Sequence, residues 1–103
     1  MNKELKKDFF DGKIAIHVTN EVQQQIIVLK AIKKVEKLND FDNNLLAFKE
    51  HPYFVITNFN NVTALNCSNN KEACINCGYS ISEFEDVFNY ELKEVQNAKD
   101  WKP

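Results

Sequence analysis

The sequence contains no arginine, since all thirteen basic residues are lysines. Bidentate recognition of phosphate or carboxylate by a guanidinium group is therefore excluded, and single ammonium groups must hold any anion. Glycine occurs only twice, which excludes the glycine-rich loops of Walker and Rossmann sites. No window approaches eighteen uninterrupted apolar residues, and residues 1–8 are charged. We expect a cytoplasmic protein without an export signal or a membrane-spanning segment.

Cysteine is also sparse, and its number is odd. An odd set fits a reducing compartment better than a disulfide framework. Cys74 and Cys77 have the spacing of a zinc knuckle, but such a site needs four ligands and a second close pair is missing. Cys67 and either His17 or His51 would have to complete it. We predict reduced thiols, no metal and no cofactor, with the three cysteines as weak zinc candidates.

The sequence shows no arrangement typical of catalysis. Nucleophilic catalysis needs a serine or cysteine beside a base that a third group orients. His17 lies on an expected strand and His51 precedes a proline, and neither belongs to a catalytic pattern. A lone histidine more often has a structural role. We therefore predict no catalytic residues, and a protein that is not an enzyme and works by binding.

The chain does contain enough apolar material for one core. Its hydrophobic fraction is 44%, and it includes eight phenylalanines. No stretch rich in proline, glycine or serine divides the 103 residues. We predict a single domain over residues 1–103, because this length lies in the usual range of one domain.

The periodicity of the apolar residues predicts the fold class. Alternating apolar residues predict strands at residues 13–18 and 79–84. Aromatic and β-branched residues predict a strand at 53–57, which forms a hairpin with a returning strand at 62–66 through a turn at 58–61. Apolar positions at helical spacing predict one main helix over residues 21–38, with Thr19 or Asn20 as its N-cap, and an acidic helix over 85–100. We expect an α+β fold in which the main helix packs on a small, mostly antiparallel sheet of about four strands, followed by a C-terminal helix.

Lysines are concentrated in the first part of the chain. Residues 1–37 hold eight lysines against five acids, whereas residues 38–103 hold five lysines against ten acids. On the main helix they form a ridge of Lys30, Lys33, Lys34 and Lys37. This ridge suits a nucleic-acid backbone, and Phe41, Tyr53 or Phe54 could add stacking. Glu36 interrupts it, so a solvated helix face is the simpler explanation and nucleic-acid binding is the alternative hypothesis.

Acidic residues gather in the last part of the chain. Residues 83–100 hold six acids against two lysines. A solvated helix explains this composition, but an acidic surface also docks on a basic one, such as the groove of a nuclease. The candidate partner-binding residues are Glu83, Glu85, Asp86, Glu91 and Glu94.

Two segments resemble a known kind of protein. Residues 12–21 read Gly-Lys-Ile-Ala-Ile-His-Val-Thr-Asn-Glu, and residues 78–87 read Gly-Tyr-Ser-Ile-Ser-Glu-Phe-Glu-Asp-Val. With this "IHxTxE" opening and "GYxIxEFxD" closing, the chain resembles small uncharacterised bacteriophage and prophage proteins of AT-rich hosts. The segments cover about a fifth of the chain. The residues Val22-Gln23-Gln24 depart from the acid-rich start of the helix that the resemblance implies.

The resemblance implies a helix on a small, mostly antiparallel sheet, encoded by a mobile element, with no catalytic residues to carry over. Several small phage proteins of this size inhibit host defences, including CRISPR effectors. Our first hypothesis is therefore a viral, anti-CRISPR-like inhibitor that binds a host protein or ribonucleoprotein complex in the host cytoplasm. Nucleic acid is the alternative partner, a homodimer is open, and no membrane partner is expected.

Overall fold

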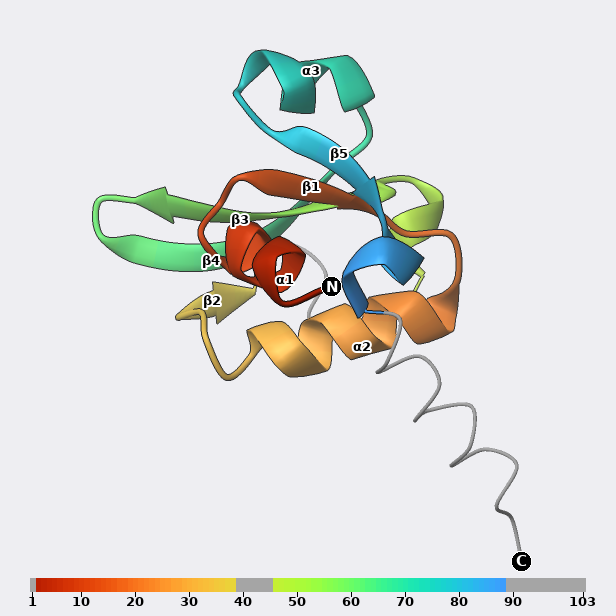
Figure 1. Cartoon of the computed structure of the whole chain (residues 1–103), viewed down its shortest axis with the longest axis horizontal. Coiled ribbons are helices and arrows are strands. Elements are labelled where there is room, and N and C mark those ends of the chain that lie inside the picture. Colours follow the sequence, from red (N-terminus) through yellow and green to blue (C-terminus); the bar gives the residue numbers. More distant parts are fainter. Residues whose placement is uncertain (1, 39–45, 89–103) are drawn as a thin grey trace, which may run out of the picture.

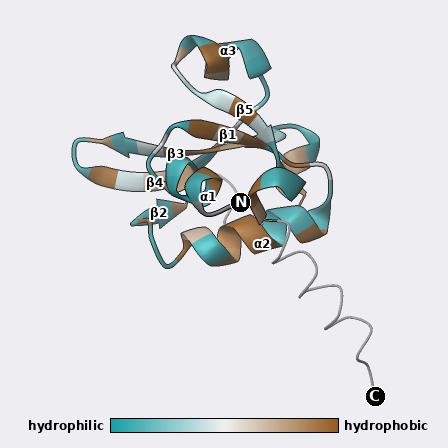
Figure 2. Cartoon of the chain, viewed as in Figure 1, coloured by the Kyte–Doolittle hydropathy of each residue, from teal (hydrophilic) through white to brown (hydrophobic). Residues whose placement is uncertain are grey.

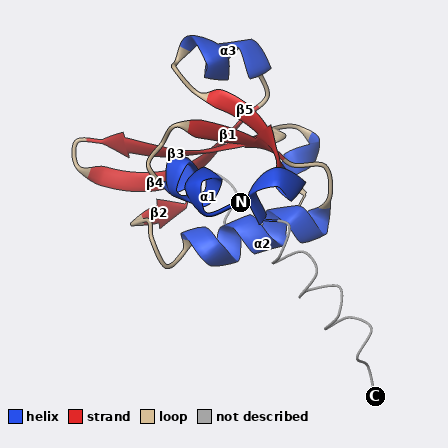
Figure 3. Ribbon diagram, viewed as in Figure 1, coloured by secondary structure: helices blue, strands red, loops and turns tan. Residues whose placement is uncertain are grey.

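Helices and strands are interspersed along the chain (Figures 1 and 3). The first elements are helix α1 (Asn2–Phe10), strand β1 (Ile14–His17), helix α2 (Glu21–Ala31) and strand β2 (Lys37–Leu38). Then follow the 3-10 helix η1 (Ala47–Lys49), strands β3 (Tyr53–Phe59) and β4 (Val62–Ser68), helix α3 (Lys71–Asn76) and strand β5 (Ser80–Glu83). Residues 84–88 are helical. The computed structural model describes residues 2–38 and 46–88, and these form an α+β fold, as predicted.

The described strands form one mixed sheet in the order β2-β4-β3-β1-β5. The pairs β1/β3 and β3/β4 are antiparallel, whereas β1/β5 and β2/β4 are parallel. The expected sheet of about four mostly antiparallel strands was therefore only roughly right. Alternation of apolar residues reveals a strand but not its direction, and β1 and β5 pair across more than sixty residues of intervening chain.

The β3–β4 hairpin was predicted, and its turn is set by two asparagines. Asn60 and Asn61 have φ values of 53° and 65°. This left-handed conformation at both central residues is typical of the tight hairpin turn that matches the twist of the strands, and asparagine tolerates it well. The strands extend to Phe59 and from Val62, so the turn is shorter than the predicted residues 58–61.

Helix α2 begins where the sequence predicted. Asn20 is its N-cap, and the side-chain Oδ1 of Asn20 accepts a hydrogen bond from the backbone N–H of Gln23 at 2.9 Å. This contact satisfies one of the amide groups that the first turn of a helix leaves without a partner. The predicted start of the main helix is therefore confirmed.

The end of α2 corrects the prediction, because the helix stops at Ala31 and not at residue 38. The backbone N–H groups of Lys34 and Val35 both bond to the Ala31 carbonyl, and that of Glu36 bonds to the Thr63 carbonyl. The chain then pairs with β4 as β2, so the sheet satisfies the backbone groups that a longer helix would have satisfied. Sheet pairing has overridden helical periodicity here.

The main core lies between one face of the sheet and the layer formed by α1, α2 and residues 84–88 (Figure 1). Helix α2 contributes Ile26, Ile27 and Ala31, and the hydropathy colouring shows its apolar patch (Figure 2). The aromatic part of the core joins the two ends of the described chain: Phe9 of α1 packs edge to face on Phe88, with ring centroids 6.1 Å apart. This contact fixes α1 beside the helical turn that follows β5.

A second, smaller cluster occupies the opposite face of the sheet. Ala15, Val55 and Cys74 are buried there, beneath α3. Tyr79 packs on this cluster and donates its hydroxyl hydrogen to the Ile56 carbonyl at 3.3 Å. Burial raises the pKa of the Tyr79 hydroxyl, and the neighbouring Cys77 and Cys74 raise it further. Within the described residues, one short helix covers this face, whereas α1, α2 and residues 84–88 cover the other.

Candidate anion-binding site

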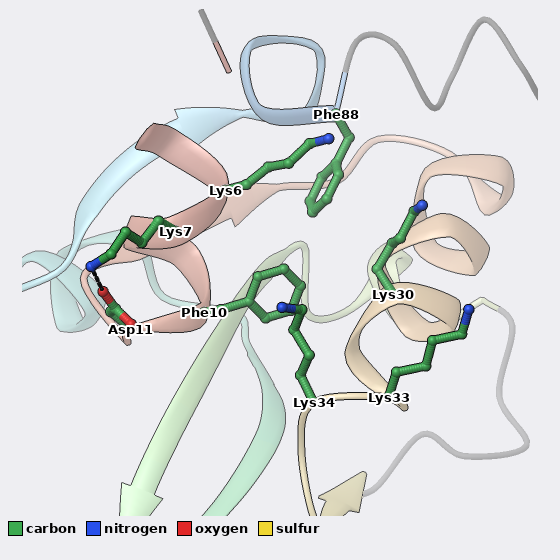
Figure 4. A pocket seen from close by; sticks show the side chains of 8 residues that line it. All are labelled: Lys6, Lys7, Phe10, Asp11, Lys30, Lys33, Lys34 and Phe88. Carbon is green, nitrogen blue, oxygen red and sulfur yellow. Dashed lines mark hydrogen bonds and ion pairs between the residues drawn. The ribbon is translucent and has the colours of Figure 1, made fainter. Parts of the chain in front are cut away.

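A hollow of about 500 Å³ lies between α1 and the end of α2 (Figure 4). Five of the residues that line it are lysines, from two elements that are distant in sequence. Its lining residues, which define what we call the lysine pocket, are Lys6, Lys7, Phe10, Asp11, Lys30, Lys33, Lys34 and Phe88. This volume lies within the range of pockets that hold one small molecule, about 300–1,000 Å³.

Helix α1 supplies one wall of the lysine pocket. Lys6 Nζ lies 5.8 Å from the centroid of the buried Phe88 ring, which forms part of the floor. Lys7 Nζ donates to Asp11 Oδ2 at 2.8 Å and points away from the centre of the pocket (Figure 4). This hydrogen bond is the main cause that raises the pKa of Lys7 and lowers that of Asp11. The Asp11 carboxylate thus partly neutralises the positive charge of Lys7.

The end of α2 supplies the other wall. Lys30 lies in the last turn of the helix, where positive charge interacts favourably with the helix dipole. Lys33 and Lys34 lie on the turn beyond Ala31, and both are exposed. Lys34 reaches across the pocket, so that its Nζ lies 5.0 Å from the centroid of the Phe10 ring (Figure 4). Because α2 ends at Ala31, the chain turns there and brings Lys33 and Lys34 toward α1 (Figure 4).

Lysines predominate among the described residues that line the lysine pocket. Five lysines and one carboxylate, that of Asp11, line it, and this carboxylate is bonded to Lys7. Ammonium groups confined to one hollow repel one another, and an anion that enters relieves this repulsion. The formal net charge of −2 does not oppose such binding, because physiological salt screens exposed charges beyond about 8 Å.

Three of the four lysines of the predicted ridge lie close together in the structure. Lys30, Lys33 and Lys34 line the same pocket, but Lys37 does not. Lys37 belongs to β2 and borders a separate shallow hollow beside Phe59, because the chain has left the helical path before reaching it. The prediction of four lysines on one helix was therefore wrong, because only Lys30 belongs to α2.

Five of the eight residues that line the lysine pocket were not predicted from the sequence as site residues. These are Lys6, Lys7, Phe10, Asp11 and Phe88, which form one wall and the floor. A signal was present, because residues 6–10 place two lysines and two phenylalanines within about two helical turns. The pairing of α1 with α2 was not visible, since it depends on tertiary packing.

Of the aromatic residues predicted to stack on bases, the two that the structure describes do not line the lysine pocket. Phe54 is fully buried in the main core, so its assignment was wrong. Tyr53 stacks on His17, with ring centroids 5.2 Å apart, and Phe41 lies outside the described residues. His17 Nδ1 lies 3.0 Å from Glu83 Oε1, and this contact joins directly paired residues of β1 and β5. The contacts of His17 with Tyr53 and Glu83 link β1 to β3 and β5, and none of these three residues lines the lysine pocket.

The structure describes three of the five predicted acidic residues, at the end of β5 and just beyond it. Glu83, Glu85 and Asp86 are exposed. Glu83 contacts His17, as described above, and Glu85 Oε1 accepts a hydrogen bond from the side-chain Nε2 of Gln23 at 2.9 Å. Glu91 and Glu94 lie outside the described residues. Two of the three described carboxylates therefore have contacts within the fold.

The weak zinc candidates do not assemble into a ligand set. All three cysteines border a shallow hollow of about 320 Å³ near α3. Cys67 is paired with Phe54 across the hairpin and packs against the main core, whereas Cys74 belongs to the cluster on the opposite face. Among the residues that the structure describes, no group of three or more metal-binding side chains is arranged to hold a metal ion. Of the two histidines proposed to complete the set, His51 is half-buried beside η1 and His17 contacts Glu83.

Comparison with known proteins finds no matching family model, curated protein or solved structure. Within the described ranges, every helix is too short or too polar to cross a bilayer. The geometry of the lysine pocket is therefore the strongest indication of function that this chain offers.

Proposed function

We propose that the protein acts by binding and not by catalysis, and that the lysine pocket holds the phosphate backbone of a nucleic acid. One observation carries this proposal: α1, the end of α2 and the turn after it place five lysines around one hollow, of which only Lys7 points away, toward Asp11 (Figure 4). Each ammonium group that neutralises a phosphate releases condensed counterions, which favours binding in a way that depends steeply on salt.

The composition of the lysine pocket favours nucleic acid over other anions. Ammonium groups bind phosphate as point charges and do not need the planar, two-bond geometry that a guanidinium group forms with a carboxylate. The Phe10 ring lies among them, half-buried. Lysines interspersed with an accessible aromatic ring are typical of surfaces that bind nucleic acid. This proposal develops the alternative hypothesis from the sequence, with a changed set of residues.

A salt series tests the proposal. We would titrate the 103-residue chain into labelled oligonucleotide and follow fluorescence anisotropy at several salt concentrations. For a single strand, the slope of log K against log salt is about −0.7 for each phosphate contact. We expect the variant Lys33→Gln/Lys34→Gln to bind more weakly and to flatten the slope by about 1.4, since it removes two contacts.

The control is a variant with the same change of charge outside the lysine pocket. Lys49→Gln/Lys71→Gln removes two exposed lysines that do not line it, so its slope should match that of the unchanged chain. Absence of binding to single-stranded and duplex oligonucleotides at low salt would refute the proposal. Equal effects of the two double variants would show that bulk charge, and not this pocket, is responsible.

The acidic residues favour a second candidate function, inhibition of a host nucleic-acid-processing protein by occupancy. Its supporting observation is the exposure of Glu83, Glu85 and Asp86 within four residues of chain. We would compare affinity capture from a bacterial host lysate by the unchanged chain, by Asp86→Lys and by Glu72→Lys, an exposed acid on α3. A partner lost only with Asp86→Lys supports this candidate, whereas no enriched partner, or equal retention, counts against it.

A further inference from the structure

The Phe10 ring is positioned to do more than fill the floor of the lysine pocket. It is the last residue of α1 and is half-buried. Its ring packs edge to face on Phe9 and Phe88, with centroid distances of 5.1 and 6.5 Å. Lys34 Nζ lies over the ring at 5.0 Å, on the side of the pocket (Figure 4). The core therefore holds the ring in place, and the side chain of the exposed Lys34 covers it.

A nucleic-acid base can take the place of this ammonium group. An exposed cation–aromatic contact corresponds to about a two- to fivefold effect on an equilibrium. Stacking of a base on an aromatic side chain corresponds to about five- to 150-fold per base. Stacking on Phe10 is thus the stronger interaction, and displacement frees the Lys34 ammonium for a neighbouring phosphate.

We infer that the lysine pocket takes single-stranded nucleic acid, with one unpaired base stacked on Phe10 and the flanking phosphates on lysines of both walls. This inference rests on the proposed function. In a duplex the base faces are stacked on one another, and only base edges and phosphates are accessible from outside. A base reaches the ring inside the hollow only when it is unpaired.

The lining of the pocket also indicates that the base is not identified. In the described part of the chain, the polar side chains that border it are five lysines and Asp11, without an amide or hydroxyl group. Base-specific recognition relies on donors and acceptors held at fixed positions along base edges. A lysine ammonium is a point charge on a flexible stem, and the Asp11 carboxylate is bonded to Lys7, so neither presents such a fixed pattern. Stacking tolerates any base, because every base presents a flat face. We therefore expect binding with little sequence preference.

The test compares three anions on the whole chain, namely a mixed-sequence single-stranded oligonucleotide, its duplex and inorganic polyphosphate. We expect the single strand to bind more tightly than the duplex. Phe10→Leu should weaken single-strand binding about fivefold or more and leave duplex and polyphosphate binding unchanged. Phe10→Trp should retain or strengthen single-strand binding. Phe59→Leu changes an exposed phenylalanine at the hairpin and is the matched control.

Each other outcome has a defined meaning. Equal binding of single strand and duplex, with no specific effect of Phe10→Leu, overturns the inference and leaves the proposed function standing. Uniform weakening of all three anions by Phe10→Leu, without rescue by Phe10→Trp, shows that the ring has a structural role only and also overturns the inference. Binding of polyphosphate alone, or of no anion at low salt, overturns both the inference and the proposed function.

Discussion

Truncation of Phe9 should destabilise the protein strongly, because this residue fixes α1 to the core. Its side chain is fully buried, and it packs edge to face on Phe10 and Phe88 with centroid distances of 5.1 and 6.1 Å. Removal of a buried phenylalanine ring costs about 3–5 kcal/mol through lost transfer energy and the cavity left behind. A domain is stable by only about 5–15 kcal/mol in total. Phe9→Ala should therefore remove about a fifth or more of the free energy of unfolding.

Urea denaturation followed by circular dichroism measures this loss. With a slope of about 1–3 kcal/mol/M, the midpoint should fall by on the order of 2 M. The matched control is Phe59→Ala, the same substitution at a residue that is 77% exposed, which should stay within about 0.5 kcal/mol of the unchanged chain. A loss below about 1 kcal/mol for Phe9→Ala would refute the packing of α1 that builds the lysine pocket.

Two further changes test the supports of the pocket walls. Gln24→Leu should destabilise the fold by about 1–3 kcal/mol in the same denaturation assay. The reason is that Gln24 is fully buried and its Oε1 accepts a hydrogen bond from the backbone N–H of Phe48 at 3.0 Å. Unchanged stability would argue against this contact. Lys7→Gln should raise the pKa of the Asp11 carboxyl toward its ordinary value, as measured by NMR titration. The pKa of Asp11 is lowered in the folded chain. The ionised carboxylate therefore contributes stability above its ordinary pKa, and this contribution is lost as the pH falls through the lowered pKa. An Asp11 pKa that does not change in the variant would contradict the ion pair with Lys7.

The local elements of the fold were accessible from the sequence. The N-cap contact of Asn20 and the hairpin follow from local patterns, and both were predicted. The path of residues 32–38 was not, because Val35 and Leu38 pack against the core in a way that also satisfies helical spacing. Only the pairing of β2 with β4 distinguishes the two conformations, and periodicity carries no information about such a distant partner.

The candidate site was accessible only in part for the same reason. Three of its lysines follow one another on α2 and the turn after it, so the sequence showed them together. Phe10 and Phe88 are seventy-eight positions apart and meet only because both ends of the described chain pack on the same face of the sheet. The sequence also does not show whether a phenylalanine is buried, like Phe54, or borders a pocket, like Phe10.

Amide chemical shifts locate the binding surface most directly. In ¹⁵N–¹H spectra of the labelled chain, titration with a single-stranded oligonucleotide at low salt should shift the signals around Phe10, Asp11, Lys33 and Lys34. Signals on α3, such as that of Lys71, should remain in place because α3 lies on the other face of the sheet. Shifts confined to α3, or to Glu85 and Asp86, or no shifts at all, would contradict binding in the lysine pocket.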